Sequence, residues 1–93
     1  MVIGVCTLEL HLPQCHSLKE KRMVVSRVKG RLSSRFNVAV AEVEHQDLWQ
    51  RAAIAVVSVA AGRPPLEGTF SKVVEEVERA SAGVLLRHDT EYL

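Results

Sequence analysis

The chain has 93 residues, of which 47% are hydrophobic and only 4% aromatic, so the sequence predicts one small domain with an aliphatic core. Its net charge of +1 excludes a grossly basic nucleic-acid binder and an acidic tail. The two cysteines form no Cys-x-x-Cys pair, and with neither a basic amino-terminal region nor an apolar run of about 20 residues, we expect a cytoplasmic protein without a membrane segment.

Residues 2–12 alternate between apolar and polar side chains, which predicts a strand with one buried and one wetter face. Pro13 ends this strand. Ser17, with Glu20 three residues later, forms a capping box, so a helix is expected to begin there and to close at Asn37. The apolar residues of this segment fall within one helical arc, which predicts that the helix packs on a sheet.

Two further strands are predicted at residues 38–44 and 48–61, both rich in Val and Ala. The segment 62–65, Gly-Arg-Pro-Pro, breaks the second of them, and helical spacing of apolar residues follows. Gly83 stops that helix, and residues 84–93 predict a last strand.

This order predicts an α+β fold, a ferredoxin-like βαββαβ sandwich over residues 1–93. Right-handed crossovers favour a four-stranded antiparallel sheet in strand order 4-1-3-2, with two helices on one face. The alternative is a three-stranded sheet whose last strand is frayed or donated to a partner. The predicted topology gathers a set of polar residues at one end of the domain, namely Glu9, His11, His16, Lys19, Lys21, Glu42, Glu44, His45, Asp47, Trp49 and Arg51.

Several strings of this sequence resemble the YlxP-like family of small bacterial proteins. They read GV at residues 4–5, ELHLP at 9–13, SLKEKR at 17–22, RFNV at 35–38 and AEVEHQDLWQRA at 41–52. The resemblance implies a ferredoxin-like fold in a family of unknown function. It also implies genes that commonly neighbour those for translation initiation and ribosome maturation factors. It therefore suggests a cellular neighbourhood and no activity.

Lys21 falls inside the apolar arc of the first predicted helix, so we expect a carboxylate, Glu42 or Glu9, to hold its ammonium group. Glu42 and Glu44 are two residues apart on a strand and should share one face. With His45 and Asp47 they could bind a divalent metal or act as acid and base. No spacing here matches a known metal loop, so neither a metal nor a cofactor is expected.

Trp49 is the only tryptophan and stands beside a predicted turn. It either covers the end of the core or anchors a partner. The candidate partner-binding residues at this end are His16, Lys19, Lys21, Glu42, Glu44, His45, Asp47, Trp49 and Arg51. One interpretation is a homodimeric adaptor that binds another protein here. A small enzyme using Glu42, His45 and Lys21 is a further alternative, for which no small-molecule substrate can be identified.

The first predicted helix is basic, with seven cations and one acid between residues 17 and 37. Such a helix can follow RNA phosphates, or it can be a solvated face. The candidate RNA-binding residues are Arg27, Lys29, Arg31 and Arg35. The central strands offer no aromatic side chains for stacking on bases, so binding should lack sequence specificity. The leading hypothesis is a non-enzymatic protein of translation or ribosome assembly that binds structured RNA weakly.

The helices of this fold cover one face of the sheet, yet the third strand is apolar on both faces. An apolar patch of this kind usually marks an interface, which predicts a homodimer. Its candidate residues are Ile3, Val5, Ala53, Ala55 and Val57, provided that no bulge near Trp49 exchanges the two faces of the strand.

Overall fold

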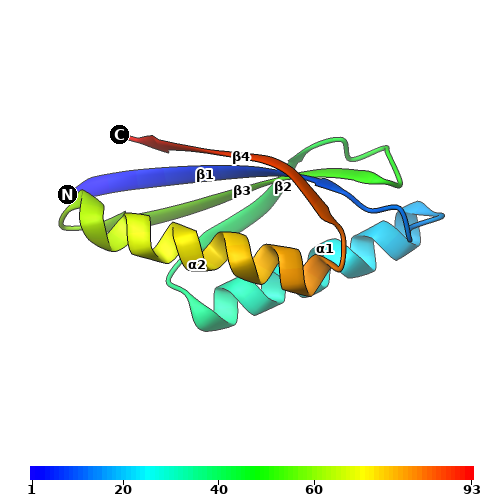
Figure 1. Ribbon diagram of the computed structural model, residues 1–93, viewed down its shortest axis with the longest axis horizontal. Helices are drawn as coiled ribbons and strands as arrows, with labels where there is room; N and C mark the ends of the chain where they lie inside the picture. The colour runs from blue at the N-terminus through cyan, green and yellow to red at the C-terminus, as the bar shows by residue number, and fades with distance from the viewer.

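The computed structural model describes residues 1–93, which form a layer of four β-strands packed against a layer of two α-helices. In chain order its elements are β1 (Val2–His11), α1 (Leu18–Arg35), β2 (Ala39–Glu44), β3 (Arg51–Ala60), α2 (Arg63–Ser81) and β4 (Val84–Tyr92). The sheet has the order β2-β3-β1-β4 with antiparallel pairings, and both helices lie on the same side of it (Figure 1). This confirms the predicted ferredoxin-like sandwich. The three-stranded alternative is wrong, because β4 pairs with β1.

The core lies between the sheet and the two helices. Alternate residues of β1 and β3 face the helices, and each helix contributes one apolar stripe. The buried core comprises Cys6, Leu8, Leu10, Leu12, Cys15, Val24, Val25, Val28, Leu32, Ala52, Ile54, Val56, Leu66, Phe70, Val73 and Val77. Gly4 allows α2 to cross the start of β1 closely, since a Cβ atom there would lie 2.6 Å from the Phe70 ring.

The start of α1 follows the capping prediction with one difference. The Ser17 hydroxyl oxygen accepts a hydrogen bond from the Glu20 main-chain N–H at 3.1 Å. The Glu20 carboxylate accepts from the main-chain N–H of His16 at 2.7 Å, one residue earlier than in the usual reciprocal box. The second helix begins at Arg63 with two prolines in its first turn and no side-chain cap. Neither helix has the length of apolar sequence that crossing a bilayer requires.

The connection between β2 and β3 differs from the sequence prediction. The third strand begins at Arg51, so residues 45–50 form a loop, which we call the hairpin tip. Pairing also shifts at a bulge, so that Glu42 lies opposite Ile54 while Glu44 lies opposite Ala53. Adjacent residues of β3 face opposite sides of the sheet. The expectation that Glu42 and Glu44 share a face is therefore wrong, because the bulge adds one residue between them.

Candidate functional site

The polar residues expected at one end of the domain do lie there, but the sheet separates them into two groups. The hairpin tip and the connection from β1 to α1 both lie at this end, which is on the right in Figure 1. Lys21 and Glu42 are on the helix side of the sheet, where Glu42 pairs with the inward-facing Ile54. Glu9, Glu44, His45 and Arg51 gather on the other side, which we call the open face.

Lys21 is a buried clamp on the hairpin tip. Its side chain is 1% exposed, and its ammonium nitrogen lies 2.9 Å from Glu42 Oε2, which confirms the predicted pair. The same nitrogen donates to the main-chain oxygens of His45 at 2.6 Å and Gln46 at 3.0 Å. The Arg51 carbonyl oxygen is 3.4 Å away. Because its protons are committed to these acceptors, Lys21 holds the tip in place and offers no free amine to a substrate.

Gln50 fixes the other side of the tip. Its amide nitrogen donates to the main-chain oxygens of Pro13 at 3.2 Å and Cys15 at 3.1 Å. The tip and the connection from β1 to α1 therefore form one rigid unit. Leu48 and Trp49 project from this unit and are 48% and 52% exposed, so Trp49 does not cover the core. Nothing in the sequence pattern marks Gln50, because both of its acceptors are main-chain atoms.

On the open face, Glu9 is the centre of an ion-pair network. Its carboxylate lies 3.1 Å from Arg51 Nη2 and 3.2 Å from His45 Nε2, with one oxygen for each. The hydrogen bond from His45, together with the positive charge of Arg51, lowers the pKa of the Glu9 carboxyl. His45 adopts a left-handed backbone conformation with φ of 65°, which is uncommon for a residue other than glycine.

Glu9, Glu44 and His45 are the residues that could hold a metal, since their ligand atoms lie within 4.8 Å of one another. Both Glu9 oxygens, however, already have partners in Arg51 and His45. A divalent cation would have to displace these partners and sit beside a guanidinium group. The arrangement therefore resembles a surface ion-pair network more than a metal centre.

The other predicted residues at this end play separate parts. His16 is exposed and contributes its main-chain N–H to the cap of α1. Lys19 is exposed on α1, and Asp47 is exposed on the hairpin tip. The Cys15 side chain is buried, and burial raises the pKa of its thiol, which disfavours a nucleophilic thiolate.

The exposed surface of α1 is the strongest concentration of charge in the molecule. Its exposed cations are Lys19, Arg22, Arg27, Lys29, Arg31 and Arg35, against the single exposed acid Glu20. Apart from the buried Lys21–Glu42 pair, the rest of the chain has five cations and nine acids. The chain is therefore polarised, with a basic helix on one side and an acidic remainder, although its net charge is only +1.

One flank of α1 is held against α2. Arg27 Nε donates to the main-chain oxygen of Ala80 at 2.9 Å. Arg31 and Arg35 lie 3.7 Å and 3.1 Å from the carboxylate of Glu76, which is 3% exposed. Nothing in the sequence pattern marks Glu76 as the acceptor for this flank.

The opposite flank is free. It consists of Lys19, Arg22 and Lys29, none of which makes an ion pair. These three side chains are thus available to an external anion without loss of an internal contact.

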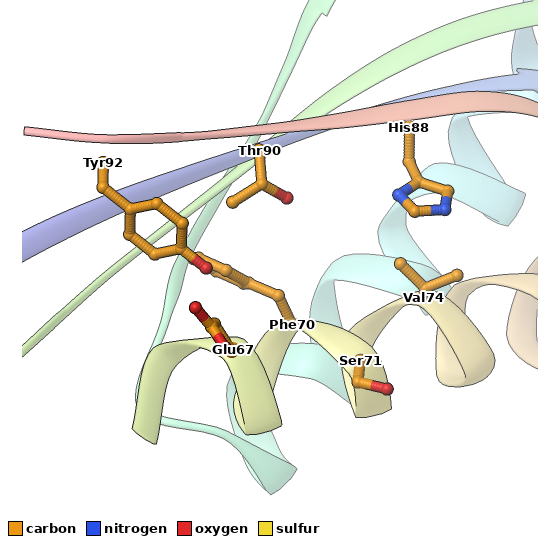
Figure 2. A pocket seen from close by; sticks show the side chains of 7 residues that line it. All are labelled: Glu67, Phe70, Ser71, Val74, His88, Thr90 and Tyr92. Carbon is orange, nitrogen blue, oxygen red and sulfur yellow. The ribbon is translucent and has the colours of Figure 1, made fainter. Parts of the chain in front are cut away.

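A groove runs between α2 and β4, and Figure 2 shows the side chains that line it: Glu67, Phe70, Ser71, Val74, His88, Thr90 and Tyr92. His88 and Thr90 of β4 point toward α2 and remain exposed, whereas Tyr92 is partly buried beside the Phe70 ring. The Arg63 guanidinium lies 4.2 Å from the Tyr92 ring centroid and borders the groove. The groove has a volume of about 280 Å³, which is at the lower limit for a small-molecule site.

Comparisons with known proteins identify a family and a fold. Residues 3–90 match the family described as Protein of unknown function (DUF503). The chain is 32% identical over 77 residues to the Uncharacterized protein YlxP of Bacillus subtilis (strain 168), covering 83% of this chain and 84% of that protein.

Among solved structures, the flavoenzyme CrmK aligns with a TM-score of 0.60 at 14% identity, over 99% of this chain and 19% of that one. The putative chlorite dismutase TA0507 aligns with a TM-score of 0.56 at 14% identity, over 99% and 44%. The chain thus spans less than half of either protein, and the likeness concerns the fold alone.

Proposed function

The chain belongs to the DUF503 family, whose function is unknown, and we propose that it is a non-enzymatic protein that binds structured RNA on the exposed surface of α1. The observation that supports this proposal is the charge of that surface, which has six exposed cations and one exposed acid. Association with ribosomal RNA in the cytoplasm, during translation or ribosome assembly, is part of the proposal. It accords with the gene neighbourhood that the family resemblance implies.

The shape of α1 supports contact with a phosphate backbone. Its 18 residues extend over about 27 Å. Ser26, Gly30 and Ser34 lie on the outer surface of the helix, so small side chains separate the two basic flanks beyond the exposed Met23. A Cβ atom at Gly30 would meet nothing within 4 Å, so no packing within the chain requires glycine there. A low surface between two rows of cations allows a backbone to approach closely.

The sheet does not offer an alternative RNA surface. Recognition of bases by a four-stranded sheet depends on aromatic side chains of the central strands, on which the bases stack. The open-face residues of β1 and β3 include none. Over the whole open face, the acids Glu9, Glu44, Asp89 and Glu91 outnumber the cations Arg51 and Arg87. Binding through α1 alone should therefore be weak, independent of base sequence and sensitive to salt.

The experiment compares charge reversal on the free flank of α1 with charge reversal on α2. Fluorescence anisotropy with a labelled ribosomal RNA hairpin at low salt measures affinity. Reversing Lys19, Arg22 and Lys29 together to Glu should weaken binding more than tenfold without breaking an internal ion pair. Lys29→Glu alone should weaken it more than Lys72→Glu, the matched change at an exposed lysine of α2. Equal affinity of the triple variant and the parent would refute the proposal.

Reversal of Arg27, Arg31 and Arg35, which are three of the four candidate RNA-binding residues, is a less clean test. New acids at these positions would stand beside the buried Glu76 carboxylate and weaken the contact between the helices. Binding lost in that variant would combine two effects. Replacement by Gln, with the fold checked by circular dichroism, separates them.

A second candidate function, docking of another protein on the hairpin tip, is supported by the exposure of Trp49 on a loop that hydrogen bonds of Lys21 and Gln50 attach to the rest of the chain. Exposed tryptophans can anchor an interface, and a loop that is already held loses little entropy on binding. Trp49 is also the only tryptophan, so its fluorescence reports directly on the tip. A blue shift on adding a purified partner, together with weaker binding of that partner by the Trp49→Ala chain in isothermal titration calorimetry, would support this function. Binding of RNA to α1 should leave the emission unchanged.

A further inference from the structure

We propose that the open face of the sheet packs against the same face of a second copy of this chain. This inference is independent of RNA binding, because the two surfaces lie on opposite sides of the domain. In Figure 1 the helices lie below the sheet, and the open face is the uncovered upper side.

The half of the open face at the start of β1 is apolar across three strands. On β1 and β3, Ile3 lies opposite Val59 and Val5 lies opposite Val57. Val57 and Val59 are 36% and 47% exposed, although no helix or loop of this chain is available to cover them. A contiguous apolar patch of this kind on a small domain usually marks an interface.

The edge strand β2 extends the patch with small side chains. Ala39 lies opposite Val57, and Ala41 lies opposite Ala55. Ala53, which the sequence suggested for the interface, is only 1% exposed and lies in register between the longer Glu9 and Glu44. It therefore cannot contribute a contact.

Polar residues border the apolar half on β4 and toward the hairpin tip. Along β4 the open-face positions are Arg87, Asp89 and Glu91. Arg87 is paired with Asp89 at 2.9 Å, and Arg51 is paired with Glu9 at 3.1 Å, so much of the rim charge is already neutralised. An apolar centre within a polar rim is the usual anatomy of a protein–protein interface. The surplus of acids on this face disfavours nucleic acid as its occupant.

The dimensions of the sheet suit a second copy. Two strands of 10 residues, one of 9 and one of 6, about 4.8 Å apart with a rise of about 3.3 Å per residue, give a face of about 550 Å². Two such faces would bury about 1,100 Å², just above the roughly 1,000 Å² that a specific interface needs. A two-fold axis parallel to the strands places the apolar half of one copy on the apolar half of the other. The alanines of β2 and β3 allow the sheets to approach closely.

Sedimentation equilibrium at micromolar concentration tests the proposal. The wild-type chain should have twice the 10.3 kDa mass of one copy. Val57→Glu should reduce it to a monomer, while Met23→Glu, at a 64% exposed position on α1, should leave the dimer intact. Ala41→Glu, on an exposed edge position, provides a second disrupting variant if Val57→Glu does not fold by circular dichroism.

Two results would overturn the proposal: a wild-type mass near 10.3 kDa, or a dimer that persists in folded Val57→Glu and Ala41→Glu alike. The variants also separate this proposal from RNA binding. A monomeric Val57→Glu chain should retain the RNA affinity of an isolated α1 surface, whereas the Lys19, Arg22 and Lys29 reversal should lose RNA and remain a dimer.

Discussion

Replacing Lys21 by Met should destabilise the domain strongly, because it removes a buried charge that holds the hairpin tip. Methionine keeps most of the apolar stem and deletes the ammonium group. The Glu42 carboxylate then loses its ion-pair partner, and the carbonyl groups of His45 and Gln46 lose their hydrogen-bond donor. The apolar contacts of the Lys21 stem remain, so the effect reports on the polar clamp.

The size of the effect follows from the burial of these groups. Breaking a buried ion pair by removing one partner costs about 3–5 kcal/mol. The Glu42 side chain is 17% exposed and can regain some water, so the lower end, about 3 kcal/mol, is expected. For a domain of this size that loss lowers Tm by about 12–24 °C.

Urea denaturation followed by circular dichroism measures the loss, with Trp49 fluorescence as a local probe of the tip. Lys19→Met is the matched control, since Lys19 is exposed on the same helix turn and makes no ion pair. That control should change the free energy of unfolding by less than about 0.5 kcal/mol. A double-mutant cycle with Glu42→Gln should give a coupling of at least about 1 kcal/mol. Equal effects of the Lys21 and Lys19 substitutions would refute the clamp.

Three further outcomes are expected. Folding lowers the pKa of the Glu9 carboxyl from its ordinary value near 4.5. The ionised carboxylate therefore stabilises the fold fully above pH 4.5, and this stabilisation is lost as pH falls through the lowered pKa. Glu9→Gln should flatten the acid side of a plot of urea midpoint against pH. Gly30→Ala should stabilise the chain by about 1 kcal/mol, whereas Gly4→Ala should destabilise it by about 1–3 kcal/mol because of overpacking. A lower Tm for Gly30→Ala and a higher Tm for Gly4→Ala would contradict both. Burial raises the pKa of the Cys6 and Cys15 thiols, so iodoacetamide should label them slowly at neutral pH until urea unfolds the chain; rapid native labelling would disprove this.

The fold could be predicted from the sequence because its local signals agree with one another. The alternation in β1, the Ser17 cap and the prolines at the start of α2 each specify an element independently of the rest of the chain. The Lys21–Glu42 pair was also predictable, since a lysine in an apolar arc requires a nearby carboxylate.

The details of the site were less accessible to sequence reasoning. The prediction that residues two apart on a strand share a face holds only where strand pairing is regular. The bulge in β2 breaks this regularity and places Glu42 and Glu44 on opposite faces, which the alternating pattern could not predict. Gln50 acts through main-chain acceptors, which leave no pattern in the sequence. The pairing of Arg31 with Glu76 depends on how the two helices cross, and neither helix specifies that crossing alone.

The salt dependence of RNA binding tests the central proposal most directly. If four to six cations of α1 neutralise phosphates, the slope of log K against log salt should lie between about −3 and −5. The slope should become shallower by about two to three when Lys19, Arg22 and Lys29 are changed to Gln. Binding that is absent at low salt, or a slope near zero that these substitutions do not change, would contradict a role for α1 in binding RNA.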